Sequence, residues 1–220
     1  MKLLVVGGHS RNIGKTSVAS GLIAATRELG WTALKLTQFG HNLCSADGHA
    51  CDCAPANPEH PFAITREENR EGASDTSRFL AAGASEAWWV RTPQGRLAEA
   101  MPAIRGLMEG RPYVMAESNS LVRFLRPDVY LMVLEPGTAD FKSSAREALD
   151  RADAFLQIET ERVRPVWEGV SLEVIGRRPL FRVRPSEWVT PEVLEFVRQR
   201  LGMEPTKNGP NGGDWEYTGW

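Results

Sequence analysis

The sequence predicts an α/β fold in which a mostly parallel sheet is flanked by helices in three layers. Strand-like apolar runs alternate with helical segments along the chain, and the first such pair encloses a glycine-bounded loop. Composition agrees, because 42% hydrophobic and 25% charged residues in a chain of 220 are ordinary for a globular protein. We therefore expect one domain over 1–202 and a flexible tail over 203–220, which is rich in Gly, Pro and Asn.

The first strand and helix are the best-defined elements of the sequence. The run 2–6 is mainly apolar, which suits a strand buried on both faces, and the helix over 15–29 has a glycine stop at Gly30. Further strands are expected over 31–36, 87–90, 113–116, 129–134, 154–158, 172–175 and 180–183. Further helices are expected over 75–82, with Asp75 as N-cap, and over 96–108, 143–151 and 191–201.

Charge and cysteine content exclude several classes of function. A net charge of −2 gives no electrostatic reason to expect nucleic acid or an anionic membrane as a partner. No apolar run approaches the roughly 20 residues of a membrane span, and glycines interrupt the N-terminal run before it reaches the length of a signal peptide. Three cysteines make a poor disulfide framework, so we expect a reducing, cytoplasmic setting.

The strongest functional signal is the segment 8–16, with the sequence GHSRNIGKT, between the first strand and the first helix. Its glycines allow backbone amides to point at phosphate oxygens, and the helix N-terminus adds partial positive charge. Lys15 would reach the terminal phosphates, the Thr16 hydroxyl would ligate Mg²⁺, and Arg11 would neutralise charge on a transferring phosphoryl group. The nucleotide contacts expected here are Gly8, Ser10, Asn12, Ile13, Gly14, Lys15, Thr16 and Ser17. The alternatives are a plain glycine-rich turn with a solvated lysine, and a surface role for Arg11.

The spacing within this segment departs from the common phosphate-binding pattern G-x-x-x-x-G-K-S/T, because five residues separate Gly8 from Gly14. With TSVAS after Gly14 and Lys15, it resembles dethiobiotin synthetase and the cobyrinic acid diamide synthases, which are P-loop NTPases of the SIMIBI class. The segment 33–37 (ALKLT) is similar to the strand-two lysine segment of dethiobiotin synthetase. The segment 72–78 (GASDTSR) looks like the acidic segment of the molybdopterin-guanine dinucleotide biosynthesis B protein.

A further match is 114–117 (VMAE), which resembles the apolar strand ending in a metal-site glutamate that both relatives use. The following Ser118, Asn119 and Ser120 replace the usual glycine-rich continuation. Together these matches span about residues 2–135. The resemblance implies a three-layer P-loop NTPase fold and a homodimer.

Three charged residues at expected strand or helix ends are candidates for the chemistry. Glu117 lies at the carboxyl end of its strand, where ligands bind in such sheets, and could face Mg²⁺ together with Thr16 and Asp75. The alternatives are a solvated turn for Glu117 and a simple helix N-cap for Asp75. Lys35 is a candidate contact for phosphate or substrate, or else a solvated lysine. Asp128 starts its strand, at the opposite edge, and is a weak candidate.

An insertion over about 38–72 lacks periodicity and carries every cysteine of the chain. We expect it to form part of the active-site rim, because it leaves the carboxyl end of the second strand. Three thiolates and one histidine make a closed tetrahedral Zn²⁺ set, with disorder as the alternative. The candidate ligands are Cys44, Cys51, Cys53 and either His41 or His49.

These features predict a Mg²⁺-dependent protein that binds ATP or GTP and hydrolyses it or transfers its phosphoryl group, as a ligase like dethiobiotin synthetase would. ATP is slightly favoured, because the segment 155–160 lacks the Asn-Lys-x-Asp signature of guanine sites. The acceptor, a small molecule or a partner protein, cannot be read from the sequence. One alternative is a nucleotide-binding adaptor for metallocofactor assembly of the molybdopterin type. Another is a metal-binding protein in which the Cys/His insertion is primary.

Overall fold

The computed structural model describes residues 1–39, 62–161 and 164–203. Its described part forms an eight-stranded sheet with the strand order β3-β4-β2-β5-β1-β6-β7-β8. Neighbouring strands are parallel except at one edge, where β3 runs antiparallel to β4. The strands are β1 (Lys2–Gly8), β2 (Thr32–Phe39), β3 (Ala63–Glu67), β4 (Glu86–Pro93), β5 (Tyr113–Glu117), β6 (Val129–Leu134), β7 (Ala154–Ile158) and β8 (Leu180–Val183).

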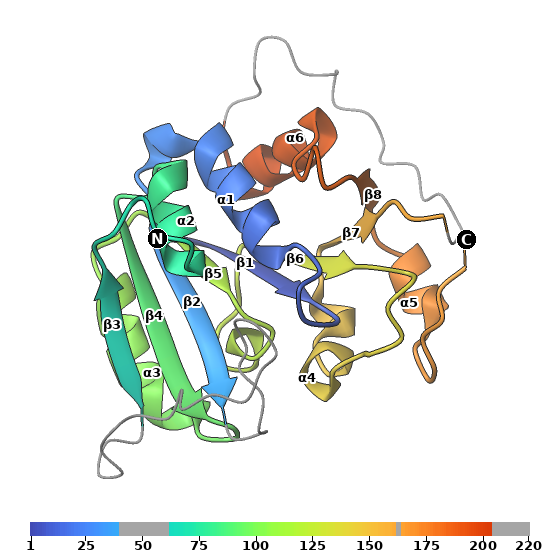
Figure 1. The fold of residues 1–220 in the computed structure, drawn as a ribbon, viewed down its shortest axis with the longest axis horizontal. Helices are drawn as coiled ribbons and strands as arrows, with labels where there is room; N and C mark the ends of the chain where they lie inside the picture. The colour runs from blue at the N-terminus through green and yellow to red at the C-terminus, as the bar shows by residue number, and fades with distance from the viewer. Residues whose placement is uncertain (40–61, 162–163, 204–220) are drawn as a thin grey trace.

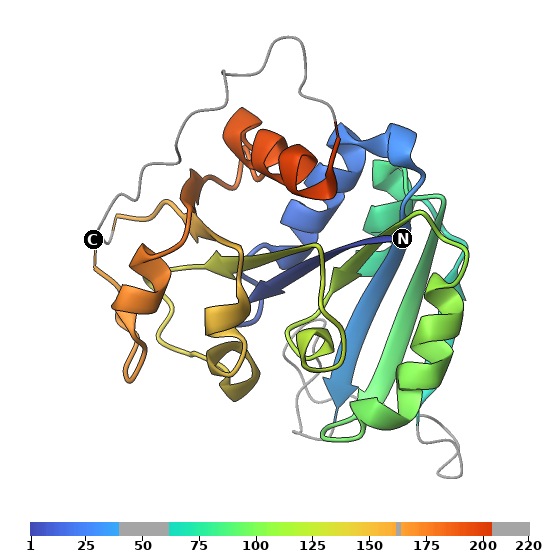
Figure 2. The same cartoon turned by 180° about the vertical axis from the view of Figure 1, so that it is seen from behind.

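Helices cover both faces of the sheet, as the two opposite views show (Figure 1, Figure 2). One apolar cluster joins the first face to α1 (Lys15–Ala25), α2 (Asp75–Ala82) and α6 (Pro191–Leu201). The second cluster joins the other face to α3 (Leu97–Met108), α4 (Ser143–Arg146) and α5 (Leu172–Gly176). Short 3-10 turns lie at Arg27–Leu29, Leu121–Arg123 and Leu149–Arg151. The predicted three-layer α/β arrangement is therefore confirmed.

The central strand β1 shows why this sequence folds in layers. Its side chains alternate between the two clusters, with Leu4 and Val6 in the first and Leu3 and Val5 in the second. Each such side chain contributes roughly 1.5–3 kcal/mol when it leaves water. A strand that is apolar on both sides is stable only between two layers of helices, and this places the loop after β1 over the middle of the sheet.

Several predicted elements are corrected by the structure. The run 172–175 is the helix α5 and not a strand, and it packs Ile175 and Val174 against the second apolar cluster. The predicted helix 143–151 divides into α4 and a 3-10 turn. Part of the predicted insertion is regular, since β2 reaches residue 39 and β3 follows at 63.

The N-cap of α2 is also corrected. Ser74 caps this helix by accepting a hydrogen bond from the Ser77 amide at 3.0 Å, so Asp75 is the first helical residue and not the cap. The Asp75 carboxylate is thereby available for other contacts. In the described ranges, no helix is long and apolar enough to cross a membrane.

Candidate functional site

A pocket of about 720 Å³ opens at the carboxyl ends of β2, β4 and β5, beside the start of α1. Polar and charged side chains dominate its lining, and loops after β5, β6 and β8 complete its rim. Of the residues predicted for the site, those that line the pocket are Arg11, Asn12, Ile13, Gly14, Lys15, Thr16, Ser17, Lys35, Asp75 and Glu117.

The loop from residue 8 to residue 16 forms one wall of this pocket. Asn12 has a φ of 52° and Gly14 a φ of 83°, so the chain makes two left-handed turns before α1 begins. Gly14 also lies against Trp188, and a Cβ on Gly14 would be 2.3 Å from the indole ring. Glycine is therefore required at residue 14 both for its conformation and for its lack of a side chain. The Lys15 ammonium donates to the Ser10 carbonyl at 2.5 Å, across the loop.

The opposite wall is a cluster of Thr16, Lys35, Asp75 and Glu117, which we call the Lys35 cluster. Lys35 and Glu117 are paired in the register of β2 and β5, which places their side chains next to each other. Glu117 is only 2% exposed, and it accepts a hydrogen bond from the Thr16 hydroxyl at 2.7 Å. The Lys35 ammonium forms ion pairs with Glu117 and with Asp75, the latter at 2.7 Å. The cluster thus connects β2, β5, α1 and α2.

Burial and neighbouring charges change the pKa values of these groups. Burial would lower the pKa of Lys35, but the Glu117 and Asp75 carboxylates outweigh it and the pKa is raised. For Asp75, burial acts to raise the pKa, but Lys35, together with Thr16 and Arg78, outweighs burial and the pKa is lowered. Lys15 is different, because burial lowers its pKa to about 8 and Glu117 opposes this only in part. The Lys35 ammonium is therefore paired with two carboxylates, whereas Lys15 forms no ion pair with any residue that the structure describes.

The pocket concentrates positive charge. The cations in its lining are Arg11, Lys15, Lys35, Arg78 and Lys142, and the anions are Asp75 and Glu117. The lining therefore carries a net charge of +3 (five minus two), although the whole chain carries −2. Such an excess of cations in one pocket attracts an anionic ligand.

The segment 135–141, which follows β6, also holds the loop in place, and we call it the β6 strap. The sequence pattern did not predict this contact. His9 is fully buried; its Nε2 accepts from the Glu135 amide at 3.0 Å, so Nδ1 carries the proton and donates to the Asp140 carbonyl at 2.8 Å. The Phe141 ring stacks on the imidazole with 5.0 Å between ring centroids. Burial lowers the pKa of His9. No periodic pattern in 135–142 could have revealed this strap, which exists only in the folded chain.

Asn119 holds the beginning of the loop and was also missed as a structural contact. Its side-chain oxygen accepts from the Gly8 amide and its side-chain nitrogen donates to the Gly8 carbonyl, both at 2.8 Å. The turn after β5 therefore clamps the end of β1. An amide side chain carries an acceptor oxygen and a donor nitrogen side by side, so it can bind both the amide and the carbonyl of one backbone residue.

Two predicted loop contacts do not reach the pocket. Gly8 is covered by the side chains of Ile13 and Lys15, and the Ser10 hydroxyl donates to the Asp140 carboxylate at 2.7 Å. Asp128 lies at the other edge of the sheet, as predicted, where it binds Lys2 at 2.9 Å. The candidate zinc ligands Cys44, Cys51, Cys53, His41 and His49 lie outside the described residues.

The buried neutral His9 leads to a prediction about stability at mildly acidic pH. Because the pKa of His9 is lowered from 6.5 in the folded protein, its stabilising contribution is complete above pH 6.5 and is lost as the pH falls through the folded value. Urea unfolding between pH 8 and about pH 5, above the titration range of ordinary carboxyl groups, should show this loss. In His9→Gln the decline over that window should be smaller; an identical decline would contradict the assignment to His9.

Comparisons with known proteins add a likeness in fold only. No protein-family model matches the chain, and no curated protein matches its sequence. Among solved structures, the chain is similar to the crystal structure of HypB from Helicobacter pylori in complex with nickel. The two are 13% identical with a TM-score of 0.47, over 94% of this chain and 91% of that chain.

Proposed function

We propose that this protein binds a nucleoside triphosphate with Mg²⁺ at the loop 8–16 and transfers or hydrolyses its terminal phosphoryl group. The observation that carries the proposal is that Lys15 and the Lys35 cluster line one cation-rich pocket from opposite walls. Lys15 forms no ion pair with any residue that the structure describes. A polyphosphate supplies the missing negative charge. The left-handed turns at Asn12 and Gly14 support this, because such turns direct successive backbone amides to one side.

The donor set in the Lys35 cluster fits Mg²⁺. Thr16, Asp75 and Glu117 offer a hydroxyl and two carboxylates, which are the hard oxygen ligands that this ion takes together with phosphate oxygens and water. The two carboxylates already converge on one cation, the ammonium of Lys35. When bound, Mg²⁺ would neutralise charge on the phosphate oxygens. Thr16, Asp75 and Glu117 would hold the ion, and Lys35 would keep the carboxylates in position or turn to an anionic acceptor.

The remaining lining suggests where the acceptor binds. Beyond the Lys35 cluster, the carboxyl ends of β2 and β4 and the turn after β5 present uncharged hydrogen-bonding side chains. These are Thr37, Gln38, Thr92, Gln94, Ser118 and Ser120. A small polar molecule with a carboxyl or carbamate group near Lys35 fits this lining, as in a ligase like dethiobiotin synthetase. Catalysis would rest mainly on positioning and charge neutralisation.

The proposal is tested by binding and turnover of the wild-type protein. We expect non-hydrolysable analogues of ATP and GTP to bind in a Mg²⁺-dependent manner, with ATP favoured because the end of β7 lacks the guanine signature. A panel of small carboxylic acids then tests for acceptors. Slow hydrolysis that no acid accelerates would favour the alternative, an adaptor for metallocofactor assembly. Failure of both analogues to bind in calorimetry would overturn the proposal.

A further inference from the structure

Lys142 is a cation of the pocket that the proposed function leaves without a role. Basic residues in this chain are mostly arginine, yet three of the five lysines, Lys15, Lys35 and Lys142, line this pocket. Lys142 lies between β6 and α4, whereas Lys35 and Glu117 come from β2 and β5. Since the strand order is β2-β5-β1-β6, Lys142 faces the loop after β1 from the side opposite to the Lys35 cluster.

The backbone around Lys142 is tied to the loop by several contacts. The Lys142 amide donates to the His9 carbonyl at 2.9 Å, and the Asp140 carbonyl accepts from His9 Nδ1 at 2.8 Å. The Asp140 carboxylate accepts from the Ser10 hydroxyl at 2.7 Å. Phe141 stacks on the His9 ring and is 6% exposed. The segment 140–142 is therefore fixed to the loop, and it holds the backbone of Lys142 at one place on the pocket rim.

The charge of Lys142 is not paired. Its ammonium makes no hydrogen bond or ion pair with any residue that the structure describes, whereas Lys35 pairs with two carboxylates and Lys2 with Asp128. Burial lowers the pKa of Lys142 to about 8; the nearby cations Lys15 and Arg11 add to this effect, and the Asp140 carboxylate opposes it only in part. A partly buried cation beside other cations is unfavourable. An anion held by Lys15 would offset that cost.

We propose that Lys142 is a further catalytic residue, which contacts the terminal phosphate of the bound nucleoside triphosphate from the side opposite to the Lys35 cluster. In the transfer step, an acceptor oxygen forms a bond to the terminal phosphorus while the bond from that phosphorus to the bridging oxygen breaks. The bridging oxygen keeps the electron pair and leaves with the nucleoside diphosphate; when water is the acceptor, its proton passes to solvent. Lys142 neutralises negative charge on the phosphoryl group during this step. This inference rests on the proposed function.

The experiment compares nucleoside triphosphate and diphosphate affinities, because only the triphosphate carries the group that Lys142 contacts. For Lys142→Ala, we expect the affinity for a non-hydrolysable ATP or GTP analogue to fall about 10- to 100-fold, the effect of one charge-assisted hydrogen bond. The affinity for the diphosphate should stay close to that of the wild type, and Lys142→Arg should recover part of the triphosphate affinity. Lys2→Ala, at the other edge of the sheet, is the matched control and should change neither affinity.

The outcomes separate this inference from the proposed function. Equal losses for triphosphate and diphosphate, or no loss for either, would overturn the role of Lys142 while leaving the nucleotide site intact. A wild-type protein that binds neither nucleotide would instead overturn the proposed function and this inference with it. Thermal melts accompany each variant, and Lys142→Met, which keeps the aliphatic stem, replaces Lys142→Ala if the alanine variant does not fold. Turnover of the folded variant should fall at saturating triphosphate as well.

Discussion

Lys15→Ala should weaken nucleoside triphosphate binding by about 10-fold to more than 1,000-fold, the loss of one or two charge-assisted hydrogen bonds of roughly 1.5–3 kcal/mol each. The variant should nevertheless fold. In the folded protein the Lys15 ammonium donates to the Ser10 carbonyl, and burial lowers its pKa to about 8 although the Glu117 carboxylate opposes this in part. Removing it costs one hydrogen bond but also relieves the desolvation of a charge. Calorimetric titration and a thermal melt measure the two effects.

The matched comparison for this variant is Lys142→Ala. Lys15 starts α1 and sits inside the loop, so its loss should weaken both the triphosphate and the diphosphate. Loss of Lys142 should weaken the triphosphate alone. Unchanged affinities in Lys15→Ala, with the fold intact, would contradict nucleotide binding at this loop.

Much of the fold and part of the candidate site follow from local signals in the sequence. The apolar run of β1 and the glycines after it predicted a strand buried on both faces followed by a glycine-bounded loop, and the structure has both. Glu117 and Lys35 were each predicted near the end of a strand, and the rule that ligands bind at the carboxyl ends of parallel strands made both candidates for the site. The structure adds that β2 and β5 are neighbours and that these two residues are in register.

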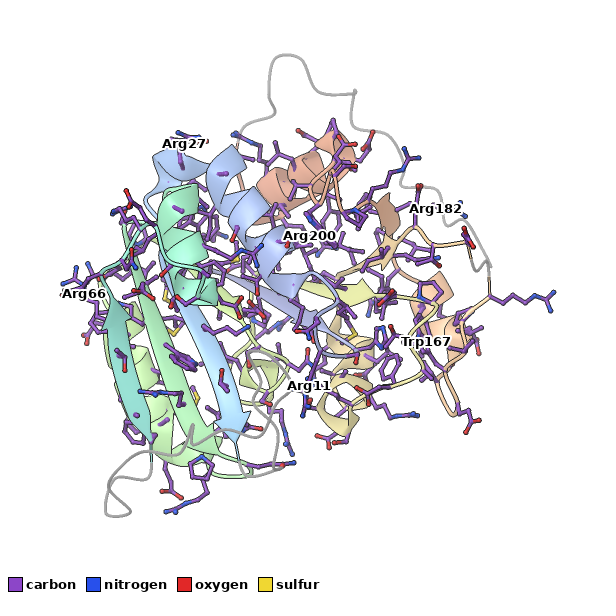
Figure 3. The ribbon with its side chains drawn as sticks, viewed as in Figure 1. Arg11, Arg27, Arg66, Trp167, Arg182 and Arg200 are labelled. Atoms are coloured by element: carbon purple, nitrogen blue, oxygen red, sulfur yellow. The ribbon has the colours of Figure 1, made fainter. Side chains whose placement is uncertain are left out.

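The remaining parts of the site depend on contacts that no local pattern encodes. Burial of His9 requires Phe141 and Trp167 from distant turns to surround the ring, and Figure 3 shows Trp167 on the side of α5. Lys142 likewise reaches the pocket rim only because its segment is held against His9 in the folded chain. The run 172–175 was assigned wrongly because its short apolar pattern fits a strand or a helix equally well. The tertiary packing of Val174 and Ile175 on the second apolar cluster accompanies the helix.

Glu117→Gln should reduce Mg²⁺-dependent turnover by about 100-fold or more. Replacing a residue that only supports a metal ligand typically lowers activity or metal affinity by about 10- to 100-fold, and the loss of a direct ligand should be at least as large as the upper value. The amide keeps the shape of Glu117 and can still accept a hydrogen bond from Thr16, but it lacks the negative charge. Nucleotide binding without Mg²⁺ should change little. Turnover as a function of Mg²⁺ concentration is the measurement, and part of the loss should be recovered at high Mg²⁺.

Asp75→Asn should act in the same direction, and the structure makes this variant more informative. Because Ser74 caps α2, replacing Asp75 by Asn removes no cap, so a loss of turnover would report on the site and not on the helix. If Asp75→Asn left turnover unchanged, the Mg²⁺ site would have to rest on Thr16 and Glu117 alone.

Glu86→Gln separates the loss of a buried carboxylate from the loss of a metal ligand. Glu86 is buried as Glu117 is, accepts from the Thr32 hydroxyl at 2.9 Å and pairs with Arg111 at 2.8 Å, but it lies at the amino end of β4, the edge away from the pocket. Both substitutions leave a buried hydroxyl and a cation with weaker partners, so each should lower the free energy of unfolding by about 1–3 kcal/mol. Only Glu117→Gln should also lose Mg²⁺-dependent turnover. Equal losses of turnover in the two variants would show that Glu117 acts through stability, and would remove it from the metal site.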